Sequence, residues 1–225
     1  PDTAVTVTGN IKFDLKIDPA LKDAVAQLSK DWRGTTQRRV FLAASTHKGE
    51  DEIILAAFTK IKTQLESALL VLVPRHPERF NQVAELCHSA GFSVVRRSAN
   101  TSVGAADILL GDSMGELMIF FGACDLAFVG GSFVPTGGHN MIEAAAWGTP
   151  VLTGPHLFNF TEAAQLLTEA GGMKVCQNFD DLADQCILLL QDESQRIQMG
   201  DAARHVAEAN RGALDRLLAV ITQII

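Results

Sequence analysis

The sequence predicts an α/β fold built on a Rossmann-like, doubly wound parallel sheet. Short apolar runs rich in β-branched residues alternate with longer helical patterns, as in successive βαβ units. No repeat, low-complexity tract or Gly/Pro/Ser linker divides the 225 residues. Hydrophobic residues make up 47% and charged residues 20% of the chain, which is typical of a globular domain. We therefore expect a single domain over residues 1–225.

The expected strands are short apolar runs, and the expected helices are the longer periodic segments between them. The strands are Arg39–Ala44, Ala68–Val73, Ser93–Arg96, Asp107–Leu110, Leu126–Val129, Pro150–Thr153 and a weaker Met173–Cys176. The helices are Glu50–Leu65, Pro77–Ala90, Gly115–Ala123, Met141–Trp147, Glu162–Ala170, Leu182–Leu190 and the long segment Ser194–Ile225. The start of the chain differs: it begins at Pro1, and a strand-like run, Ala4–Thr8, leads straight into Gly9. We interpret this as a piece of a longer protein.

Charge and cysteine usage exclude several classes of protein. The formal net charge is −7, which disfavours nucleic-acid binding because phosphate contacts need clustered Lys and Arg. No run approaches the roughly 18 apolar residues of a membrane span, and no signal peptide is recognisable, so we expect a soluble polypeptide. No CxxC pair occurs, so we expect reduced, structural thiols in a cytoplasmic setting at Cys87, Cys124, Cys176 and Cys186.

In open α/β sheets, ligands bind outside the carboxyl ends of the strands, so the loops that follow the strands carry the functional information. The first of these loops contains Ser45, Thr46 and His47. Its hydroxyls and the free N–H groups of the next helix could hold an anion. A simple N-cap is the alternative.

Two further loops hold candidate phosphate ligands. Arg75 follows the second strand between Pro74 and Pro77, where its guanidinium could fork onto a phosphate. An exposed arginine paired with Glu78 is the alternative. In the segment Gly111–Leu117, Gly115 would let a ligand approach free backbone amides, although Ser113 and Glu116 also have the spacing of a capping box.

The segment from Val129 to Pro150 is the richest. It contains Gly130, Gly131, Gly137 and Gly138 between a strand and a helix, which implies positive φ or close approach to a ligand. Asn140 and Glu143 lie one helical turn apart, and Glu143 could accept both hydroxyls of a ribose. An N-cap with its box partner is the competing interpretation of this pair. We expect His139 to donate a hydrogen bond rather than to act as a base.

A later loop contains Phe158, Asn159 and Phe160 and could line a sugar pocket, although packing of the two rings beneath the loop is as good an account. Several chemistries have no motif in this sequence: there is no GxSxG elbow, P-loop, GxGxxG after the first strand or HExxH. A DxD pair for a divalent metal is also missing. We therefore expect neither a metal site nor a cofactor.

An ordered set of short motifs resembles the 3-deoxy-D-manno-octulosonic acid (Kdo) transferases of lipopolysaccharide synthesis. The resemblance covers nearly the whole chain, and the ordered set is far more specific than any one motif. The motifs are Gly9-Asn10-Ile11-Lys12-Phe13-Asp14, Pro74-Arg75-His76-Pro77-Glu78-Arg79, Met114-Gly115-Glu116-Leu117, Gly130-Gly131-Ser132-Phe133, Gly137-Gly138-His139-Asn140 with Glu143, Gly154-Pro155 and Asn159-Phe160. Those enzymes are two-lobed GT-B glycosyltransferases, and the sequence is similar to their C-terminal lobe.

The resemblance implies that CMP-Kdo is the donor and that Kdo passes to a lipid A precursor with inversion and without a metal. It implies CMP contacts at Pro74, Arg75, Met114, Gly115, Glu116, Asn140, Met141, Ile142 and Glu143. A surrounding donor pocket would hold Ser45, Thr46, His47, Gly131, Ser132, Gly138, His139 and Asn159. Lys12 would stabilise charge that develops during transfer.

The resemblance also places the general base and the membrane anchor in an N-terminal lobe, so the full-length enzyme would act at the cytoplasmic face of the bacterial inner membrane. Residues 1–15 would enter from that lobe, and residues 194–225 would form a C-terminal helical segment. Since an inverting transfer needs a base at the acceptor and a closed cleft, we expect the chain alone to bind CMP weakly without turnover.

Other interpretations remain open from the sequence. A GT-B lobe that uses a UDP-sugar, as a transferase or an epimerase, is the main alternative within enzymes. A non-catalytic nucleotide-sugar sensor is the alternative from another class. The final segment could also serve as an interaction helix, because an apolar stripe with helical spacing runs along it, and we expect part of this stripe to be exposed. It consists of Leu214, Leu217, Leu218, Ile221 and Ile225.

Overall fold

The computed structural model describes residues 5–224, and a seven-stranded sheet runs through this part of the chain. Each pair of neighbouring strands is parallel, in the order β3-β4-β2-β1-β5-β6-β7. The strands are β1 (Val40–Thr46), β2 (Leu69–Pro74), β3 (Val94–Arg96), β4 (Ile108–Leu110), β5 (Leu126–Val129), β6 (Val151–Thr153) and β7 (Met173–Val175). The predicted strands are confirmed, and their ends differ by no more than two residues.

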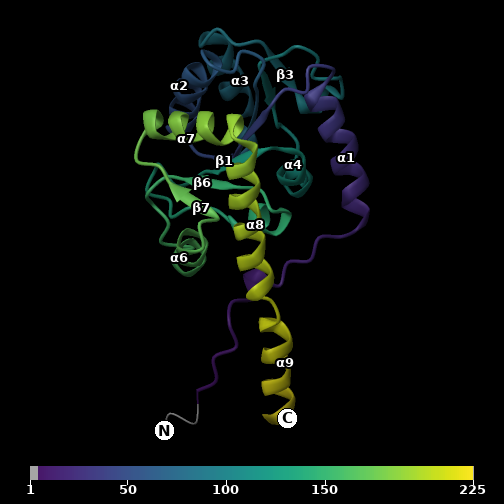
Figure 1. The fold of residues 1–225 in the computed structure, drawn as a ribbon, viewed down its shortest axis with the longest axis vertical. Helices are drawn as coiled ribbons and strands as arrows, with labels where there is room; N and C mark the ends of the chain where they lie inside the picture. The colour runs from purple at the N-terminus through teal and green to yellow at the C-terminus, as the bar shows by residue number, and fades with distance from the viewer. Residues whose placement is uncertain (1–4, 225) are drawn as a thin grey trace.

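Helices cover both faces of the sheet (Figure 1). The central strands β1 and β2 are buried along their whole length, as expected for parallel strands covered on both sides. One face packs against α2 (Glu50–Lys62), α3 (Phe80–Ser89) and α7 (Phe179–Gln191). The other packs against α1 (Ala20–Arg33), α4 (Leu117–Ala123), α5 (Ile142–Trp147), α6 (Thr161–Glu169) and α8 (Glu193–Ala209). Short 3-10 turns are η2 (Ile11–Phe13), η3 (Pro77–Arg79) and η4 (Arg97–Ala99).

The structure corrects the sequence prediction at three places. Residues 5–8 form no strand, and Ala4 of the expected strand lies outside the described residues. Helix α1 was not predicted. The expected helix over residues 194–225 is two helices, α8 and α9 (Ala213–Ile224), because the chain turns between them at Gly212, which has φ +90°, a conformation that favours glycine.

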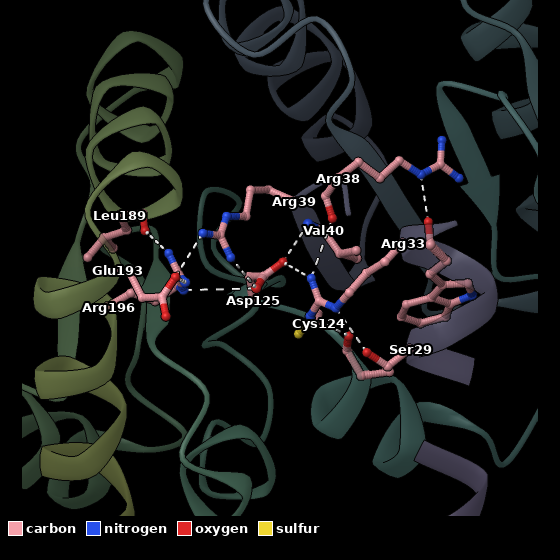
Figure 2. A network of polar contacts seen from close by, with 12 residues as sticks. Ser29, Arg33, Arg38, Arg39, Val40, Cys124, Asp125, Leu189, Glu193 and Arg196 are labelled. Atoms are coloured by element: carbon pink, nitrogen blue, oxygen red, sulfur yellow. Dashed lines mark hydrogen bonds and ion pairs between the residues drawn. The ribbon is translucent and has the colours of Figure 1, made fainter. Parts of the chain in front are cut away.

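A buried carboxylate joins two helices to the amino-terminal end of the sheet (Figure 2). Asp125, just before β5, accepts hydrogen bonds from Arg33 of α1 at 2.6 Å and from the backbone N–H of Val40 in β1 at 2.7 Å. The guanidinium groups of Arg39 and Arg196 lie 3.7 and 3.9 Å from its other oxygen. Helices α1 and α8 are thus fixed to the central strands through one side chain.

Hydrogen bonds connect the N-terminal segment to the start of the last helix. The carboxylate of Asp14 accepts hydrogen bonds from the backbone N–H groups of Gly212 and Leu214, and Arg216 of α9 donates to the carbonyl of Thr8 at 2.9 Å. Helix α9 otherwise extends away from the body of the domain beside the N-terminal segment (Figure 1). Within residues 5–224, no helix has the length and apolar character needed to cross a membrane.

The expected exposure of the apolar stripe on α9 is confirmed. Leu214, Leu218 and Ile221 have exposed fractions of 44%, 50% and 40%. Leu217 is half-buried, and Ile225 lies outside the described residues.

Candidate functional site

A cavity of about 270 Å³ opens at the carboxyl ends of β1, β2 and β5. This is where the chain leaves one half of the sheet and begins the other, because β1 pairs with β2 on one side and with β5 on the other. Ligands of doubly wound folds bind at such a switch point. The cavity is lined by Ala44, Ser45, Arg75, Leu117, Phe121, Val129, His139, Asn140 and Glu143.

The backbone at the base of the cavity is unusual. Ser45 has φ +57°, a left-handed conformation that is uncommon for a residue other than glycine, and the register with β2 shifts at this point. The loop after β5 crosses directly over it: a Cβ atom on Gly130 would lie 2.5 Å from the Ser45 carbonyl oxygen. Gly130 is therefore required for the close contact of the two loops that form the cavity floor.

Glu143 and Asn140 lie together on the cavity wall. The Asn140 side-chain amide donates to Glu143 at 3.0 Å, and its oxygen accepts from the backbone N–H of Ile142 at 3.2 Å. The two side chains are therefore paired, but they do not form the expected capping box, because the N-cap of α5 is Met141 and no side chain caps the helix. Burial raises the pKa of Glu143, while the bond from Asn140 and the charge of Arg75 act in the opposite direction.

Arg75 enters the same cavity from the end of β2 and is a cationic group on its lining. The backbone N–H of Arg75 is bonded to the Thr46 carbonyl at 3.0 Å, which fixes the chain where it leaves Pro74. Arg75 and Glu143 are 68 positions apart in the sequence but line one cavity. A guanidinium and a carboxylate in one hollow can bind an anionic group and a pair of hydroxyls at the same time.

Two imidazoles meet beside the cavity. Nε2 of His47 lies 2.7 Å from Nε2 of His139, and the two rings are nearly parallel, at 12° to each other, with centroids 4.9 Å apart. The His76 ring approaches His47 edge-on at 5.2 Å. Burial lowers the pKa of His47 and lowers that of His139 to about 4, an effect to which His47 and Arg75 contribute.

The amides of the glycine-rich loop are bound by the protein's own carboxylate. Glu50, the first residue of α2, is fully buried. Its Oε1 accepts from the N–H groups of Ser132 and Phe133, both at 2.9 Å. Its Oε2 accepts from Gly131 at 2.7 Å and from His47 at 2.9 Å. These N–H groups are therefore engaged within the protein, and the sequence reasoning missed Glu50.

The segment Met114–Glu116 lies next to Leu117, which lines the cavity. Met114 is 65% exposed, and Gly115 has φ +82° with open space where a Cβ would be. Glu116 forms a two-pronged pair with Arg97, with the shortest separation at 2.7 Å, and accepts from Ser113. Partial burial favours the neutral acid, but the bonds from Arg97 and Ser113 win and lower the pKa of Glu116.

Lys12 lies near the loop that follows β6. Its Nζ is 3.4 Å from the Asn159 carbonyl and 4.0 Å from the centre of the Phe160 ring. Asn159 is also tied to the glycine-rich loop through its side-chain amide, which donates to the Thr136 carbonyl at 2.8 Å. In that loop the N–H of Gly138 donates to the Gly131 carbonyl at 2.7 Å.

Some side chains expected at the site face the protein interior. Met141 and Ile142 are fully buried in the core, so only their backbone can reach a ligand. The Thr46 hydroxyl donates to Asp51 at 2.6 Å, and that of Ser132 donates to the Val129 carbonyl at 2.7 Å. Their hydroxyl protons are therefore used inside the protein.

A larger hollow, of about 420 Å³, lies at the opposite end of the sheet. Its basic lining residues include Arg33 and Lys62, but these are paired with Asp125 and Asp107, at 2.6 and 2.7 Å. The cavity near Glu143 is therefore the better candidate site. Among residues 5–224, no group of three or more His, Cys, Asp or Glu side chains is placed to hold a metal ion.

Relatives of known function match almost the whole chain. The 3-deoxy-D-manno-octulosonic acid transferase of Haemophilus influenzae is 43% identical over 220 residues, which are 97% of this chain and 51% of that protein. Its counterpart in Bordetella pertussis is 40% identical over 220 residues, 96% of this chain and 50% of the other. The chain thus spans about half the length of these relatives. No model of a protein family matches it.

One solved structure decides the family. The C-terminal CMP-Kdo binding domain of WaaA from Acinetobacter baumannii is 32% identical, superposes with a TM-score of 0.79, and is covered over 98% of its length by 84% of this chain. The chain belongs to the 3-deoxy-D-manno-octulosonic acid transferase family. It corresponds to the C-terminal domain of these GT-B glycosyltransferases, and the expected Rossmann-like fold is confirmed.

More distant structures resemble this transferase domain in fold only. HepE from Anabaena, solved in complex with UDP-glucose, is 15% identical with a TM-score of 0.66 over 96% of this chain. At such low identity the likeness extends to the parallel sheet and its covering helices and carries no information about the ligand.

Proposed function

We propose that this chain is the donor-binding domain of a transferase that passes Kdo from CMP-Kdo to a lipid A precursor. The observation that carries the proposal is the cavity in which Arg75, Asn140 and Glu143 meet at the switch point of the sheet. The similar domain of WaaA is described as binding CMP-Kdo. This chain covers nearly all of that domain, so the same donor is the natural ligand for its cavity.

In this proposal, each part of the nucleotide meets a matching group. Arg75 binds the phosphate, because a guanidinium forks onto phosphate oxygens. Glu143, oriented by Asn140 at 3.0 Å, accepts the ribose hydroxyls. The exposed backbone at Gly115 and Met114 borders the base, and the backbone of Met141 and Ile142 completes the contact. The sugar extends toward Ser45, His139, Gly138 and the loop of Asn159.

The other elements of the transfer belong to the half of the relatives that this chain does not match. We propose that the acceptor site, the general base and the membrane contact lie there, that the transfer proceeds with inversion and needs no metal or cofactor, and that Lys12 stabilises charge at the donor. Residues 1–15 then form the connection between the two halves, and residues 194–225 form the C-terminal helical segment. The full-length enzyme would act at the cytoplasmic face of the bacterial inner membrane.

A calorimetric titration of the chain with CMP tests the donor site. We expect CMP to bind more tightly than UMP, and Glu143→Ala to weaken CMP binding by about 1–3 kcal/mol, the usual cost of losing a charge-assisted hydrogen bond. The same substitution should abolish the preference for CMP over 2′-deoxy-CMP, since Glu143 is assigned to the ribose hydroxyls. Glu169→Ala, at an exposed carboxylate at the end of α6, is the control and should bind like the unchanged chain.

Equal binding of CMP and UMP would favour a UDP-sugar enzyme over the proposed donor. An unchanged ribose preference in Glu143→Ala would remove Glu143 from the site. For the catalytic half of the proposal, a transfer assay with CMP-Kdo and a lipid A precursor should show no turnover by this chain alone, and turnover would contradict it.

A further inference from the structure

The proposed donor carries more negative charge than the positively charged side chains on the cavity lining can balance. Besides its phosphate, Kdo is an acid, so CMP-Kdo brings a carboxylate on the sugar. Among the residues that line the cavity within the described part of the chain, Arg75 is the only Lys or Arg, and the proposed function assigns it to the phosphate. Glu143 on the same wall adds a further negative charge. Lys12 lies beside the Asn159 loop and outside the cavity lining, and the proposed function assigns it to charge that develops during transfer. A second positive group on the cavity lining itself would balance the sugar carboxylate in the bound donor.

The His47–His139 pair can provide this charge. Two imidazole nitrogens 2.7 Å apart must share one proton, because two lone pairs or two N–H groups facing each other would repel. The contact persists when one ring takes up an additional proton, since an imidazolium can donate to a neutral ring. The pair therefore exists with a charge of zero or of about +1, and not of +2.

The surroundings keep the pair neutral while the cavity is empty. Arg75, Arg79 and His76 approach His47 from the end of β2 and the turn that follows, and each opposes an added positive charge. Glu50 of α2 favours one, but its carboxylate is already bonded to four backbone N–H groups. Burial outweighs Glu50 and lowers the pKa of His47, and that of His139 falls to about 4.

His139 is the member that faces the ligand. His139 is among the residues that line the cavity, and His47 is not. His47 contacts His139 through Nε2. The Nε2 side of the His139 ring also faces Gly131, 3.1 Å from the place of a Cβ on that residue. Nδ1 is on the other edge of the ring, and none of the hydrogen bonds among residues 5–224 engages it. This atom is available to donate to a ligand oxygen.

We infer that the His47–His139 pair recognises the carboxylate of the acid sugar, taking up one proton from solvent as the donor binds and presenting an N–H of His139 to that carboxylate. The inference rests on the proposed donor site and assigns specificity within it. A donor with a neutral sugar also places a phosphate on Arg75, but it brings no carboxylate to stabilise a positive charge on the pair. The pair therefore distinguishes acid-sugar nucleotides from neutral ones.

The test compares two ligands with the same phosphodiester, CMP-Kdo and cytidine 5′-methyl phosphate, which lacks the carboxylate. Calorimetry of the chain near neutral pH, in buffers with different ionisation enthalpies, counts the protons taken up. We expect CMP-Kdo to take up about one proton more than the methyl phosphate. The affinity ratio of the two ligands should rise as the pH falls, because binding raises the pKa of the pair.

Substitutions identify the groups involved. His139→Gln and His47→Gln should each remove the additional proton uptake and lower the ratio of CMP-Kdo affinity to methyl phosphate affinity about tenfold, as for loss of a charge-assisted hydrogen bond. His205→Gln is the matched control: it replaces an exposed histidine of α8 away from the pair, and it should keep both the uptake and the ratio.

The possible failures are distinguishable. If both ligands bind but take up equal numbers of protons, and the glutamine variants keep the affinity ratio, the inference is overturned and the proposed donor site stands. If neither ligand binds the unchanged chain, the proposed function fails and the inference fails with it. A loss of methyl phosphate binding in both glutamine variants, equal to the loss of CMP-Kdo binding, would show a structural role and would also overturn the inference.

Discussion

Glu50 shows how one side chain can organise a loop from a distance. Its carboxylate collects N–H groups of residues that lie more than 80 positions away in the sequence, together with the N–H of His47. A buried charge is tolerated only when its hydrogen-bonding capacity is used, and here four donors surround it at the start of a helix. The position of the Gly130–Gly131 turn therefore depends on Glu50.

Replacing Glu50 by Gln should destabilise the domain. One of the two oxygens becomes an NH₂ group that faces two N–H donors, so two buried bonds are lost, at a cost on the order of 3 kcal/mol. Urea denaturation followed by circular dichroism measures the change. Glu52→Gln, an exposed position of the same helix, should change the free energy of unfolding by less than about 0.5 kcal/mol, and equal losses in the two variants would contradict this role of Glu50.

We expect the Glu143 carboxylate to lower the melting temperature at neutral pH while it contributes to CMP binding. Burial raises its pKa, so the folded state prefers the neutral acid, and the stability from this preference is present below the ordinary value of 4.5 and is lost as the pH rises through the raised pKa. Glu143→Gln keeps an oxygen to accept from Asn140 and should raise the melting temperature at pH 7, with no gain at pH 4. A lower melting temperature at pH 7 would contradict this account, while weaker CMP binding is expected.

The sequence indicated the residues of the cavity better than it indicated their contacts. Arg75, Asn140 and Glu143 could be proposed because each follows a strand end, where ligands of this fold bind. The contacts of Glu50 and the pairing of His47 with His139 could not, because they join residues more than 80 positions apart and local spacing carries no information about them. The hydroxyls of Thr46 and Ser132 attracted attention by their place in the loops, but they are used internally.

At the scale of the elements, Asp125 connects helices to the sheet (Figure 2). Its side chain is 7% exposed and lies among three arginines, of which Arg196 is itself only 9% exposed. Helix α1, β1 and α8 thus meet at one carboxylate. Because the pairs are buried, they resist screening by salt more than surface ion pairs do.

Asp125→Ala should be strongly destabilising. It leaves the guanidinium of Arg33 and the N–H of Val40 without their acceptor and removes the carboxylate that lies 3.9 Å from the buried Arg196. Breaking a buried pair in this way costs about 3–5 kcal/mol. The free energy of unfolding in urea is the measurement. The control, Asp201→Ala, removes the exposed pair with Arg204 on α8 and should cost no more than about 0.5 kcal/mol; similar costs for both variants would show that Asp125 is not a structural junction.

Helix α1 was the element that the sequence reasoning missed, although signals were present. Asp18 caps the first turn by accepting from the N–H of Ala20 at 2.9 Å, and Val25, Leu28 and Trp32 have helical spacing. Only Leu28 and Trp32 are buried, so the apolar stripe is narrow and the segment resembles a polar connection. The strands were easier, because runs such as Val40–Ala44 and Leu69–Val73 are apolar throughout, as buried parallel strands must be.

At the scale of the whole molecule, the two ends of the described chain are fastened together. The N–H groups of Leu214 and Gly212 bind the Asp14 carboxylate and lower its pKa, so this connection is present at neutral pH and is lost as the pH falls through the lowered pKa. Lys12 lies two residues before Asp14, in a segment held on one side by α9 and on the other by the loop of Asn159.

Asp14→Ala should release the start of α9 without unfolding the domain. The amides of Gly212 and Leu214 lose their acceptor, so their hydrogen exchange, followed by mass spectrometry or NMR, should become faster, while β1 and β5 remain protected. Asp18→Ala on the same segment serves as the control, because its carboxylate caps α1 and its loss should accelerate exchange at Ala20 alone. Unchanged exchange at Leu214 in Asp14→Ala would contradict the role of this contact.

The contact between Asp14 and the start of α9 provides a way to measure the position of the segment that carries Lys12. A donor and an acceptor dye placed on Val7 and on an exposed residue of α9 such as Leu218 would transfer energy efficiently while Asp14 holds the helix, and less so once the segment detaches. The fluorescence ratio would then report, one molecule at a time, how often the lysine is in position, and how CMP or acid changes that fraction.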